Sequence, residues 1–322
     1  MNPKCIEGCQ RGFHIAMKRK IIGIGETIMD IIFKDGQPTA AVPGGSVFNG
    51  MVSLGRLGED VTMITEIGND RVGRIILDFM TENGVNNRHV ASYDNSKSAI
   101  SLAWLNERND AEYMFYKDYP AARLEVQFPE VHADDIVMMG SYFVLNPVLR
   151  PRVKEFLEYS RSQGALIYYD LNFRSSHRHE RIKIYADMLE NLEYADIVRG
   201  STEDLENLFE NNNPQDIYQR EISFYCKQML CTDADGDIQL ITPNIRKSYQ
   251  VERIPTVSTI GAGDNFNAGI VYGLIHNDVR RDQLASLPAS TWDAIIRCGT
   301  DLAAQVCQTF DNSISREFAE NY

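Results

Sequence analysis

The sequence predicts a doubly wound α/β domain: a mainly parallel sheet with helices on both faces, and a small β-sheet lid attached to it. Short apolar runs rich in β-branched residues alternate along the chain with segments of helical periodicity. These runs are apolar almost throughout, which is typical of parallel strands buried on both faces. Two further segments carry hairpin turns and interrupt the alternation. They predict the lid.

The first part of the chain begins the alternation. Residues 21–24 form an apolar, strand-like run, and Val47, Met51 and Leu54 then recur at helical spacing behind Ser46, the predicted N-cap. Residues 61–67 predict a second strand. Apolar residues between 72 and 80 fall on one stripe of a following helix.

The second part continues the pattern. Strand-like runs follow at 135–139, 165–169, 197–198 and 228–231, and Val153, Phe156 and Leu157 mark a helix between the first two. Repeated strand–helix–strand units imply parallel strands joined by helical crossovers.

The two segments that break this pattern are residues 28–43 and 97–117. The first contains a Lys-Asp-Gly turn at 34–36, and the second a polar turn near Asn109-Asp110, each between extended runs. Both are rich in apolar and aromatic side chains, which need cover. We therefore expect one lid that closes over a ligand or meets another subunit.

Domain organisation follows from these segments. Residues 1–16 carry Pro3, Gly8 and scattered charges but no apolar core of a signal peptide. Met17, followed by three basic residues and an apolar run, has the pattern of a second start. We interpret 1–16 as an unstructured extension and 17–322 as one domain with the lid inserted.

Composition excludes several classes of function. Acidic residues outnumber basic ones 45 to 32, giving a formal charge of −13 over 322 residues, which argues against a nucleic-acid partner. No apolar stretch is long enough to span a membrane. The six cysteines show no zinc-site spacing or dense disulfide pattern. These features predict a cytoplasmic protein with reduced thiols that acts on small molecules.

The most informative motif is Gly261-Ala262-Gly263-Asp264, which precedes a helix with Phe266, Ile270 and Leu274 on one face. Glycines at such a turn let the backbone approach a ligand, and the free N–H groups of the first helical turn favour an anion. A carboxylate beside them is what phosphoryl transfer to an alcohol requires, because it takes the hydroxyl proton. Helix capping is the competing interpretation of Asp264.

A second cluster lies near the amino end. Gly44 and Gly45 precede a predicted helix in which Asn49, an indifferent helix former, offers its amide to a ligand hydroxyl. Asp30 follows the first strand, on the carboxyl-end side of the sheet where ligands bind in open α/β folds. A tight turn without ligand is the alternative for the glycine pair.

Taken together, the motifs resemble the ribokinase-like (PfkB) carbohydrate kinases from about Lys18 to about Cys307. The strong signature is Gly-Ala-Gly-Asp leading into Phe-x-Ala-Gly. Within the family, the motifs are most similar to those of fructokinases and 2-keto-3-deoxygluconate kinases. The supporting stretches occur in family order at residues 25–30, 44–49, 66–73 and 170–174.

The resemblance implies a role for each matching residue. Asp264 would be the catalytic base, with Gly261, Ala262 and Gly263 as the anion hole. The sugar hydroxyls would be held by Asp30, Gly44, Gly45 and Asn49; the ATP site would contain Asn172, Arg174, Thr232 and Gly236; Glu203 would organise Mg²⁺ through water.

Two departures from the family pattern affect this expectation. Ser258 stands where the family usually has an aspartate that helps to bind a monovalent cation, so we expect little response to potassium. In the nucleotide loop, Asp233 and Ala234 follow Thr232 where the family has Thr-x-Gly. A carboxylate near ATP, and alanine where a positive φ would be needed, predict a weaker nucleotide end.

The expected function is ATP-dependent phosphorylation of a hydroxyl on a small sugar or sugar acid, with Mg²⁺, by a homodimer formed through the lid. Fructokinase-like activity is the first expectation. The alternatives are a 2-keto-3-deoxygluconate kinase, or a sugar- or nucleotide-binding member of the fold with weak catalysis, which the departures at Ser258 and Ala234 would explain.

Overall fold

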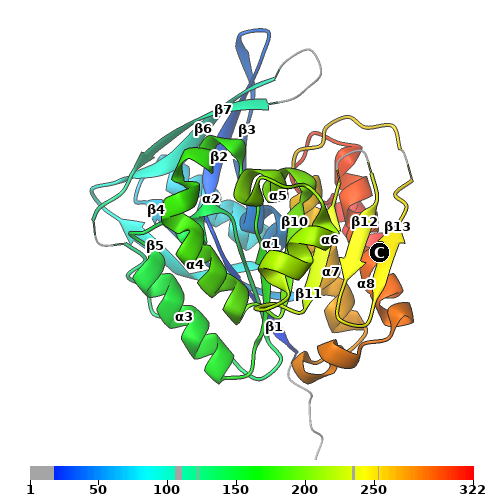
Figure 1. Ribbon diagram of the computed structural model, residues 1–322. Coiled ribbons are helices and arrows are strands. Elements are labelled where there is room, and N and C mark those ends of the chain that lie inside the picture. Colours follow the sequence, from blue (N-terminus) through cyan, green and yellow to red (C-terminus); the bar gives the residue numbers. More distant parts are fainter. Residues whose placement is uncertain (1–17, 106–110, 122, 234–235, 253) are drawn as a thin grey trace, which may run out of the picture.

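The computed structural model describes residues 18–105, 111–121, 123–233, 236–252 and 254–322. The predicted extension, residues 1–16, lies outside this part of the chain, as do the predicted turn near Asn109-Asp110 and Ala234. Two sheets occur in the described part: a main sheet of nine strands and a lid of four. Figure 1 shows the lid strands rising from one side of the main α/β layer.

The main sheet confirms the predicted alternation. Seven strands are parallel, and the last two add to one edge as an antiparallel extension. In spatial order the strands are β13 (Arg246–Tyr249), β12 (Ile238–Ile241), β11 (Gln228–Thr232), β10 (Ile197–Ser201), β9 (Leu166–Asp170), β8 (Ile136–Gly140), β1 (Lys20–Ile24), β4 (Asp60–Gly68) and β5 (Val85–Tyr93).

Helices cover both faces of this sheet (Figure 1). One face packs against α1 (Ser46–Arg56), α2 (Arg71–Glu82), α7 (Ala262–His276) and α8 (Ala289–Cys307). The other packs against α3 (Arg150–Ser162), α4 (Arg181–Tyr194), α5 (Thr202–Phe209) and α6 (Pro214–Ile217). The remaining helical segments are α9 (Arg316–Asn321) and the short turns η1 (Tyr142–Leu145), η2 (Ser175–Glu180), η3 (Tyr218–Ile222) and η4 (Arg281–Ser286).

Two buried clusters explain why the strands are apolar on both sides. Tyr168 of β9 and Met138 of β8 pack into one cluster, whereas their neighbours Tyr169 and Met139 pack into the other. Successive side chains of a strand point to opposite faces, so a sheet covered on both faces needs apolar residues at every position.

The lid contains the two predicted excursions. Its strands are β3 (Gln37–Gly44), β2 (Ile28–Lys34), β6 (Lys97–Leu105) and β7 (Ala111–Asp118), in that spatial order. β2 pairs antiparallel with β3 and parallel with β6, and β6 pairs antiparallel with β7. Both hairpins therefore form a single sheet whose base lies over the carboxyl ends of the main strands.

One local prediction is wrong. Ser46 is the first residue of α1 rather than its N-cap, which is Gly45 with φ 134° and no side-chain cap. A side chain at Gly45 would overlap the carbonyl oxygen of Glu26, and its φ is one that glycine alone adopts readily. Close backbone approach, rather than a capping hydroxyl, decides where this helix begins.

Candidate active site

Asp264 lies in the first turn of α7, directly after the glycine turn. Gly261 is the N-cap with φ 80°, and a Cβ there would lie 2.8 Å from the carbonyl oxygen of Asn312. The Ala262 N–H donates to the Thr259 carbonyl oxygen at 3.2 Å, which fixes the turn. This geometry directs the amino terminus of a fifteen-residue helix, with its positive dipole end, toward the site.

The surroundings of the Asp264 carboxyl favour its protonated, neutral form. Burial raises its pKa to about 7, and the negative charge of Asp170 acts in the same direction. A hydrogen bond from Asn49 and the charges of Arg174 and Arg199 partly oppose this rise. A carboxyl that titrates near the operating pH is suited to act as a general base.

Asn49 connects this carboxyl to a second element. It lies buried in α1, and its Nδ2 donates to Asp264 Oδ2 at 2.8 Å. Its Oδ1 is also buried and has no hydrogen-bond partner in the described part of the chain. One end of the amide thus orients Asp264, and the other has unused acceptor capacity; binding of a ligand hydroxyl there stays a prediction.

Asp30 and Gly44 form the lid side of the site. Asp30 lies in β2 and accepts a hydrogen bond from Ser101 Oγ of β6. Burial raises the Asp30 pKa to about 6, while Ser101 and Arg174 act to lower it. A side chain at Gly44 would run into the Asp30 carboxylate, so glycine is needed there.

Two of the predicted nucleotide residues lie at the carboxyl ends of β9 and β11, which are separated by β10 in the sheet. Asn172 follows β9 with φ 34°, and Thr232 ends β11. Arg174 is exposed, and its charge lowers the pKa of both Asp30 and Asp264. The Gly236 N–H makes a weak bond of 3.5 Å to the Asp233 carbonyl oxygen. Nucleotide binding by these residues stays a prediction.

The carboxylates near α5 differ in their surroundings. Glu203 is exposed in the first turn, whereas Asp204 is buried and forms a capping box with Ser201. Asp204 also accepts a hydrogen bond from the Phe173 N–H at 2.7 Å. No group of three or more His, Cys, Asp or Glu side chains in the described residues could hold a metal. An exposed Glu203 fits Mg²⁺ that arrives on phosphates and keeps its waters.

Ser258 shapes the loop before the glycine turn. It is buried, and its Oγ accepts a hydrogen bond from the Ile260 N–H at 3.2 Å. The hydroxyl therefore has a local partner two residues away. Weak potassium dependence stays a prediction.

Several residues that the sequence did not single out hold the site together. Asn265 Nδ2 donates to the carbonyl oxygens of Gly261 and Asn312, both at 2.8 Å. Asn312 Nδ2 lies 3.3 Å from where a Cβ of Gly44 would be. The segment after α8 thus contacts both glycine turns. Buried asparagines in the otherwise apolar α7 were the one available signal.

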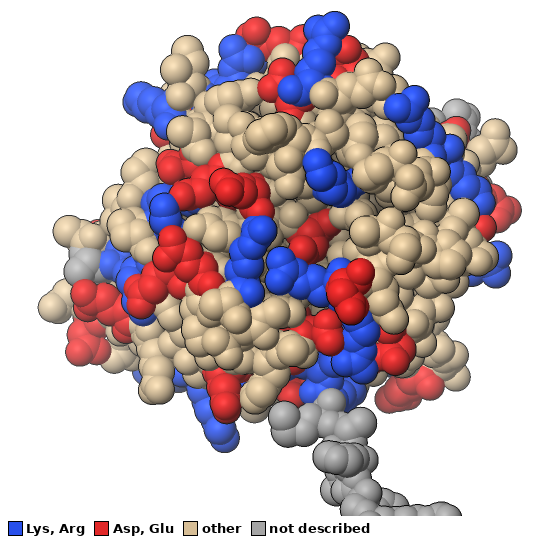
Figure 2. Space-filling model, turned by 60° about the horizontal axis from the view of Figure 1, so that its bottom comes forward, with Lys and Arg blue, Asp and Glu red and all other residues tan. Residues whose placement is uncertain are grey.

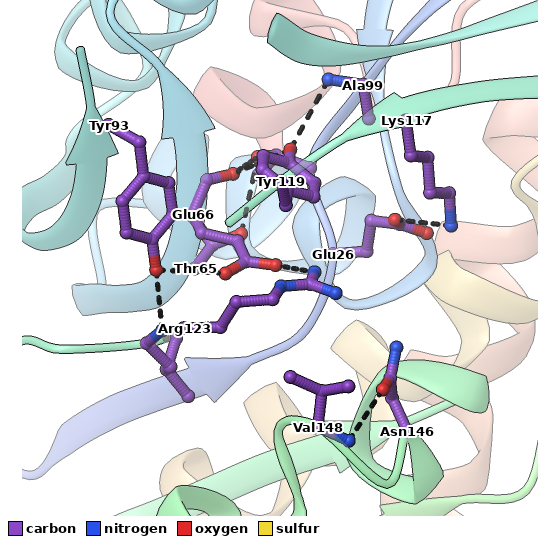
Figure 3. Close-up of polar contacts among 12 residues, drawn as sticks. Glu26, Thr65, Glu66, Tyr93, Ala99, Lys117, Tyr119, Arg123, Asn146 and Val148 are labelled. Atoms are coloured by element: carbon purple, nitrogen blue, oxygen red, sulfur yellow. Dashed lines mark hydrogen bonds and ion pairs between the residues drawn. The ribbon is translucent and has the colours of Figure 1, made fainter. Parts of the chain in front are cut away.

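A polar cluster joins the lid to the main sheet at the rim of the site (Figure 3). Glu66, buried in β4, forms an ion pair with Arg123, and the Tyr93 hydroxyl donates to Glu66 Oε2 at 3.2 Å. The Arg123 guanidinium lies 4.6 Å from the ring centre of Tyr119.

Beside this cluster, Lys117 of β7 forms an ion pair with Glu26, with 2.6 Å between Nζ and Oε1 (Figure 3). Lys117 is exposed, and Glu26 lies in the connection between β1 and β2. The pair therefore joins one end of the lid to a loop of the main domain.

The opposite end of the sheet also carries a hollow with charged walls. Its arginines are paired: Arg280 with Asp134 at 3.1 Å and Arg281 with Asp196 at 2.9 Å. On this lower face, Figure 2 shows basic and acidic side chains side by side. Both guanidinium groups are therefore neutralised, and the lining carries one carboxylate more than it has arginines. The hollow is lined by Asp134, Gly164, Asp196, Arg280, Arg281 and Asp282.

Comparison with protein families gives one match that spans nearly all of the described chain. The model of the pfkB family of carbohydrate kinases matches residues 18–318. A probable fructokinase-3 of Arabidopsis thaliana is 22% identical over 273 residues, covering 83% of this chain and 79% of the relative. A 5-dehydro-2-deoxygluconokinase of Geobacillus thermodenitrificans is 26% identical over 248 residues, covering 72% of each.

Solved structures agree on the fold. The fructokinase of Vibrio cholerae O395 with fructose, ADP and calcium bound superimposes with a TM-score of 0.79 at 21% identity, covering 91% of this chain and 94% of that one. Aminoimidazole riboside kinase from Salmonella enterica, complexed with aminoimidazole riboside and an ATP analogue, gives 0.77 at 20% identity, covering 94% and 98%. At this identity the likeness establishes the predicted fold, including its lid.

Proposed function

Since this chain belongs to the pfkB family of carbohydrate kinases, we propose that it transfers the γ-phosphoryl group of ATP to a hydroxyl of a small sugar, with a fructose-like ketose as the first expected substrate. The observation that carries this proposal is the Asn49–Asp264 pair at the amino terminus of α7. It places a carboxyl whose pKa is raised to about 7 beside backbone donors suited to a phosphoryl group.

In the proposed reaction, the sugar lies between the lid and α7. Asp30 and Asn49 Oδ1 accept hydrogen bonds from its hydroxyls, and Asp264 takes the proton of the attacking hydroxyl. The oxygen of that hydroxyl forms the new P–O bond as the bond to the leaving ADP oxygen breaks. Amides of the Gly261-Ala262-Gly263 turn stabilise the charge on the moving group.

At the nucleotide side, Asn172, Arg174, Thr232 and Gly236 would hold ATP, and Glu203 would contact Mg²⁺ through water. The metal, when bound, neutralises charge on the phosphates. Glu203 is exposed, which supports delivery of the metal with the nucleotide.

Two substrate classes compete. The 5-dehydro-2-deoxygluconokinase relative gives a reason to test sugar acids as well as ketoses; 2-keto-3-deoxygluconate belongs in the same panel. A binding protein with weak catalysis is the remaining alternative. We expect turnover with ATP and Mg²⁺ for at least one member of a panel of ketoses, ribosides and keto-sugar acids. Saturable binding without ADP formation across the panel would contradict the kinase assignment.

The proposed homodimer would form through the lid. Met114, Phe115 and Tyr116 of β7 are exposed, and pairing of two lids would cover them. Light scattering at micromolar concentration should give twice the chain mass of 36.5 kDa, and a mass near 36.5 kDa would leave the lid to fold over its own domain.

No helix in the described residues has the length and apolarity to cross a membrane. A cytoplasmic location stays part of the proposal.

A further inference from the structure

Arg199 is a buried arginine that the proposed mechanism does not use. It lies in β10 with 7% of its surface exposed. Its Nη1 is 3.0 Å from Asp170 Oδ1, and its Nη2 donates to Thr232 Oγ1 at 2.6 Å. One guanidinium therefore joins the carboxyl ends of β9, β10 and β11.

The same guanidinium packs beneath the amino terminus of α7. A Cβ on Gly263 would lie 3.0 Å from Arg199 Nη2 and 3.3 Å from Nη1. The other oxygen of Asp170 accepts a hydrogen bond from Asn267 Nδ2 at 2.8 Å, one helical turn beyond Gly263. The first two turns of α7 thus contact the strand ends at two points.

Resting on the kinase function proposed above, we propose that Arg199 is a positioning residue for phosphoryl transfer. Through Gly263 it fixes the anion hole, through Thr232 it fixes the nucleotide side of the same site, and its fixed positive charge offsets Asp170 beneath the transferring group.

The charges around this group support a role beyond packing. Burial lowers the pKa of Arg199, but the carboxylates of Asp170 and Asp204 outweigh it and hold the pKa above its usual range. The other titratable groups that interact with the guanidinium are the Tyr168 phenol, the Cys231 thiol and the Asp264 carboxyl. Arg199 therefore remains charged throughout the working pH range.

Asp170 and Arg199 shift the pKa of Asp264 in opposite directions. Asp170 raises its pKa, whereas Arg199 and Arg174 lower it, and Asn49 is its hydrogen-bond donor. Replacing Asp170 by asparagine leaves the positive charge without its partner, so the Asp264 pKa should fall. A purely structural ion pair would affect folding without moving this titration.

The chain offers a matched control. Arg150 of α3 is also 7% exposed, forms an ion pair with Glu190, and donates to Asn191 Oδ1 at 2.6 Å. It packs on the face of the sheet opposite α7. Removing either arginine leaves buried carboxylate or amide groups without a partner, which is destabilising in both cases.

The experiment compares wild type with R199M, R199K, D170N and R150M. Steady-state kinetics with the substrate found by the panel are measured from pH 5.5 to 9, alongside thermal melting. We expect R199M to lower kcat by roughly ten- to hundredfold with the sugar KM little changed, below the loss seen on removing a direct oxyanion donor. R199K should recover part of this loss, because lysine restores the charge but not the two-point fork.

D170N should move the acid limb of kcat to lower pH by on the order of half to one unit. R150M should lower the melting temperature and leave kcat and its pH profile unchanged. If R199M does not fold, the kinetics of R199K test the inference instead. A wild-type kcat and pH profile in R199K would overturn it. Equal kcat losses in R199M and R150M, or an unmoved profile in D170N, would also overturn it. A wild type that turns over no sugar overturns the proposed function itself.

Discussion

The two ends of the site are built in different ways. The phosphoryl end consists of strand ends and the first turn of α7, fixed by buried contacts among Asp170, Arg199 and Asn267. The lid end combines buried contacts with partly exposed links, such as the ion pair of Lys117 with Glu26. Buried, hydrogen-bonded groups are held rigidly, whereas exposed ion pairs contribute little. We infer that the phosphoryl end is preformed and that the lid end adjusts when a sugar binds.

The largest expected effect tests the preformed end. Asp264→Asn keeps the shape and the bond to Asn49 but removes the base. Positioned proton transfer contributes about 10²–10⁴-fold, so kcat should fall by that factor while sugar affinity persists. Asp282→Asn, at the exposed opposite end, is the control. Near wild-type kcat in Asp264→Asn would end the mechanism as proposed.

The same variant should also be more stable, because the pKa of Asp264 is raised from 3.8 to about 7 on folding. The contribution of this protonated carboxyl to the free energy of unfolding is fully present below the pKa of the unfolded state. It is lost as pH rises through about 7, the pKa of the folded state. The melting-temperature gain of Asp264→Asn over wild type should therefore grow from pH 5 to pH 8. A gain that shrinks over this interval would contradict the assigned pKa.

Asp30→Ala tests the lid end. A carboxylate contributes charged hydrogen bonds of about 1.5–3 kcal/mol each, so sugar affinity should fall at least about tenfold with little effect on ATP. Asp35→Asn, in the turn of the same hairpin, should leave both affinities unchanged. Isothermal titration measures both. Equal loss of both affinities would indicate damage to the fold instead.

The pH dependence of kcat and that of sugar affinity should differ, because Asp264 and Asp30 have different pKa values. In the proposed mechanism, Asp264 must be ionised to accept a proton, and its pKa is raised to about 7. Asp30 would accept sugar hydroxyls most strongly when it is ionised, and its pKa is raised to about 6. As pH falls, kcat should decline first and the sugar affinity about one unit later. Initial rates at saturating sugar, and equilibrium sugar binding, give the two curves. Coincident curves would mean that one group controls both.

The smallest expected effect concerns the exposed link. Lys117→Met removes the ion pair with Glu26, a type of contact worth about 0–1 kcal/mol, so the sugar KM should rise by roughly fivefold at most. The difference should shrink in high salt. Lys97→Met, on β6, is the matched control. A loss that exceeds tenfold would show that the lid end is as rigid as the phosphoryl end.

Most of the fold could be predicted from the sequence, because local residue patterns encode its strands, helices and turns. Apolar runs predicted six strands of the main sheet (β1, β4, β8, β9, β10 and β11), and turn residues such as those at 34–36 predicted the lid hairpins. The Gly-Ala-Gly-Asp motif likewise located the start of α7. β5 was not predicted, because its sequence from Val85 to Tyr93 is half polar and only its pairing with β4 makes it a strand.

The supporting residues of the site escaped prediction for a different reason. Arg199 meets Thr232 and Gly263 only after three strands and a helix have assembled, and nothing local distinguishes it from a surface arginine. Ser101 reaches Asp30 only through the pairing of β2 with β6. Long-range packing creates these contacts, so no local periodicity encodes them.

Asn312 has a consequence for how the protein is made. Its carbonyl oxygen accepts a hydrogen bond from Asn265. The same residue packs against Gly44, from the amino-terminal part of the chain, and against Gly261, from the carboxyl-terminal part. Synthesis proceeds from the amino end, so all four lid strands emerge long before this residue. Until Asn312 is made, the growing chain therefore carries the lid strands without the segment that completes the site. A ribosome stalled before residue 312 should hold a folded lid and no competent sugar site.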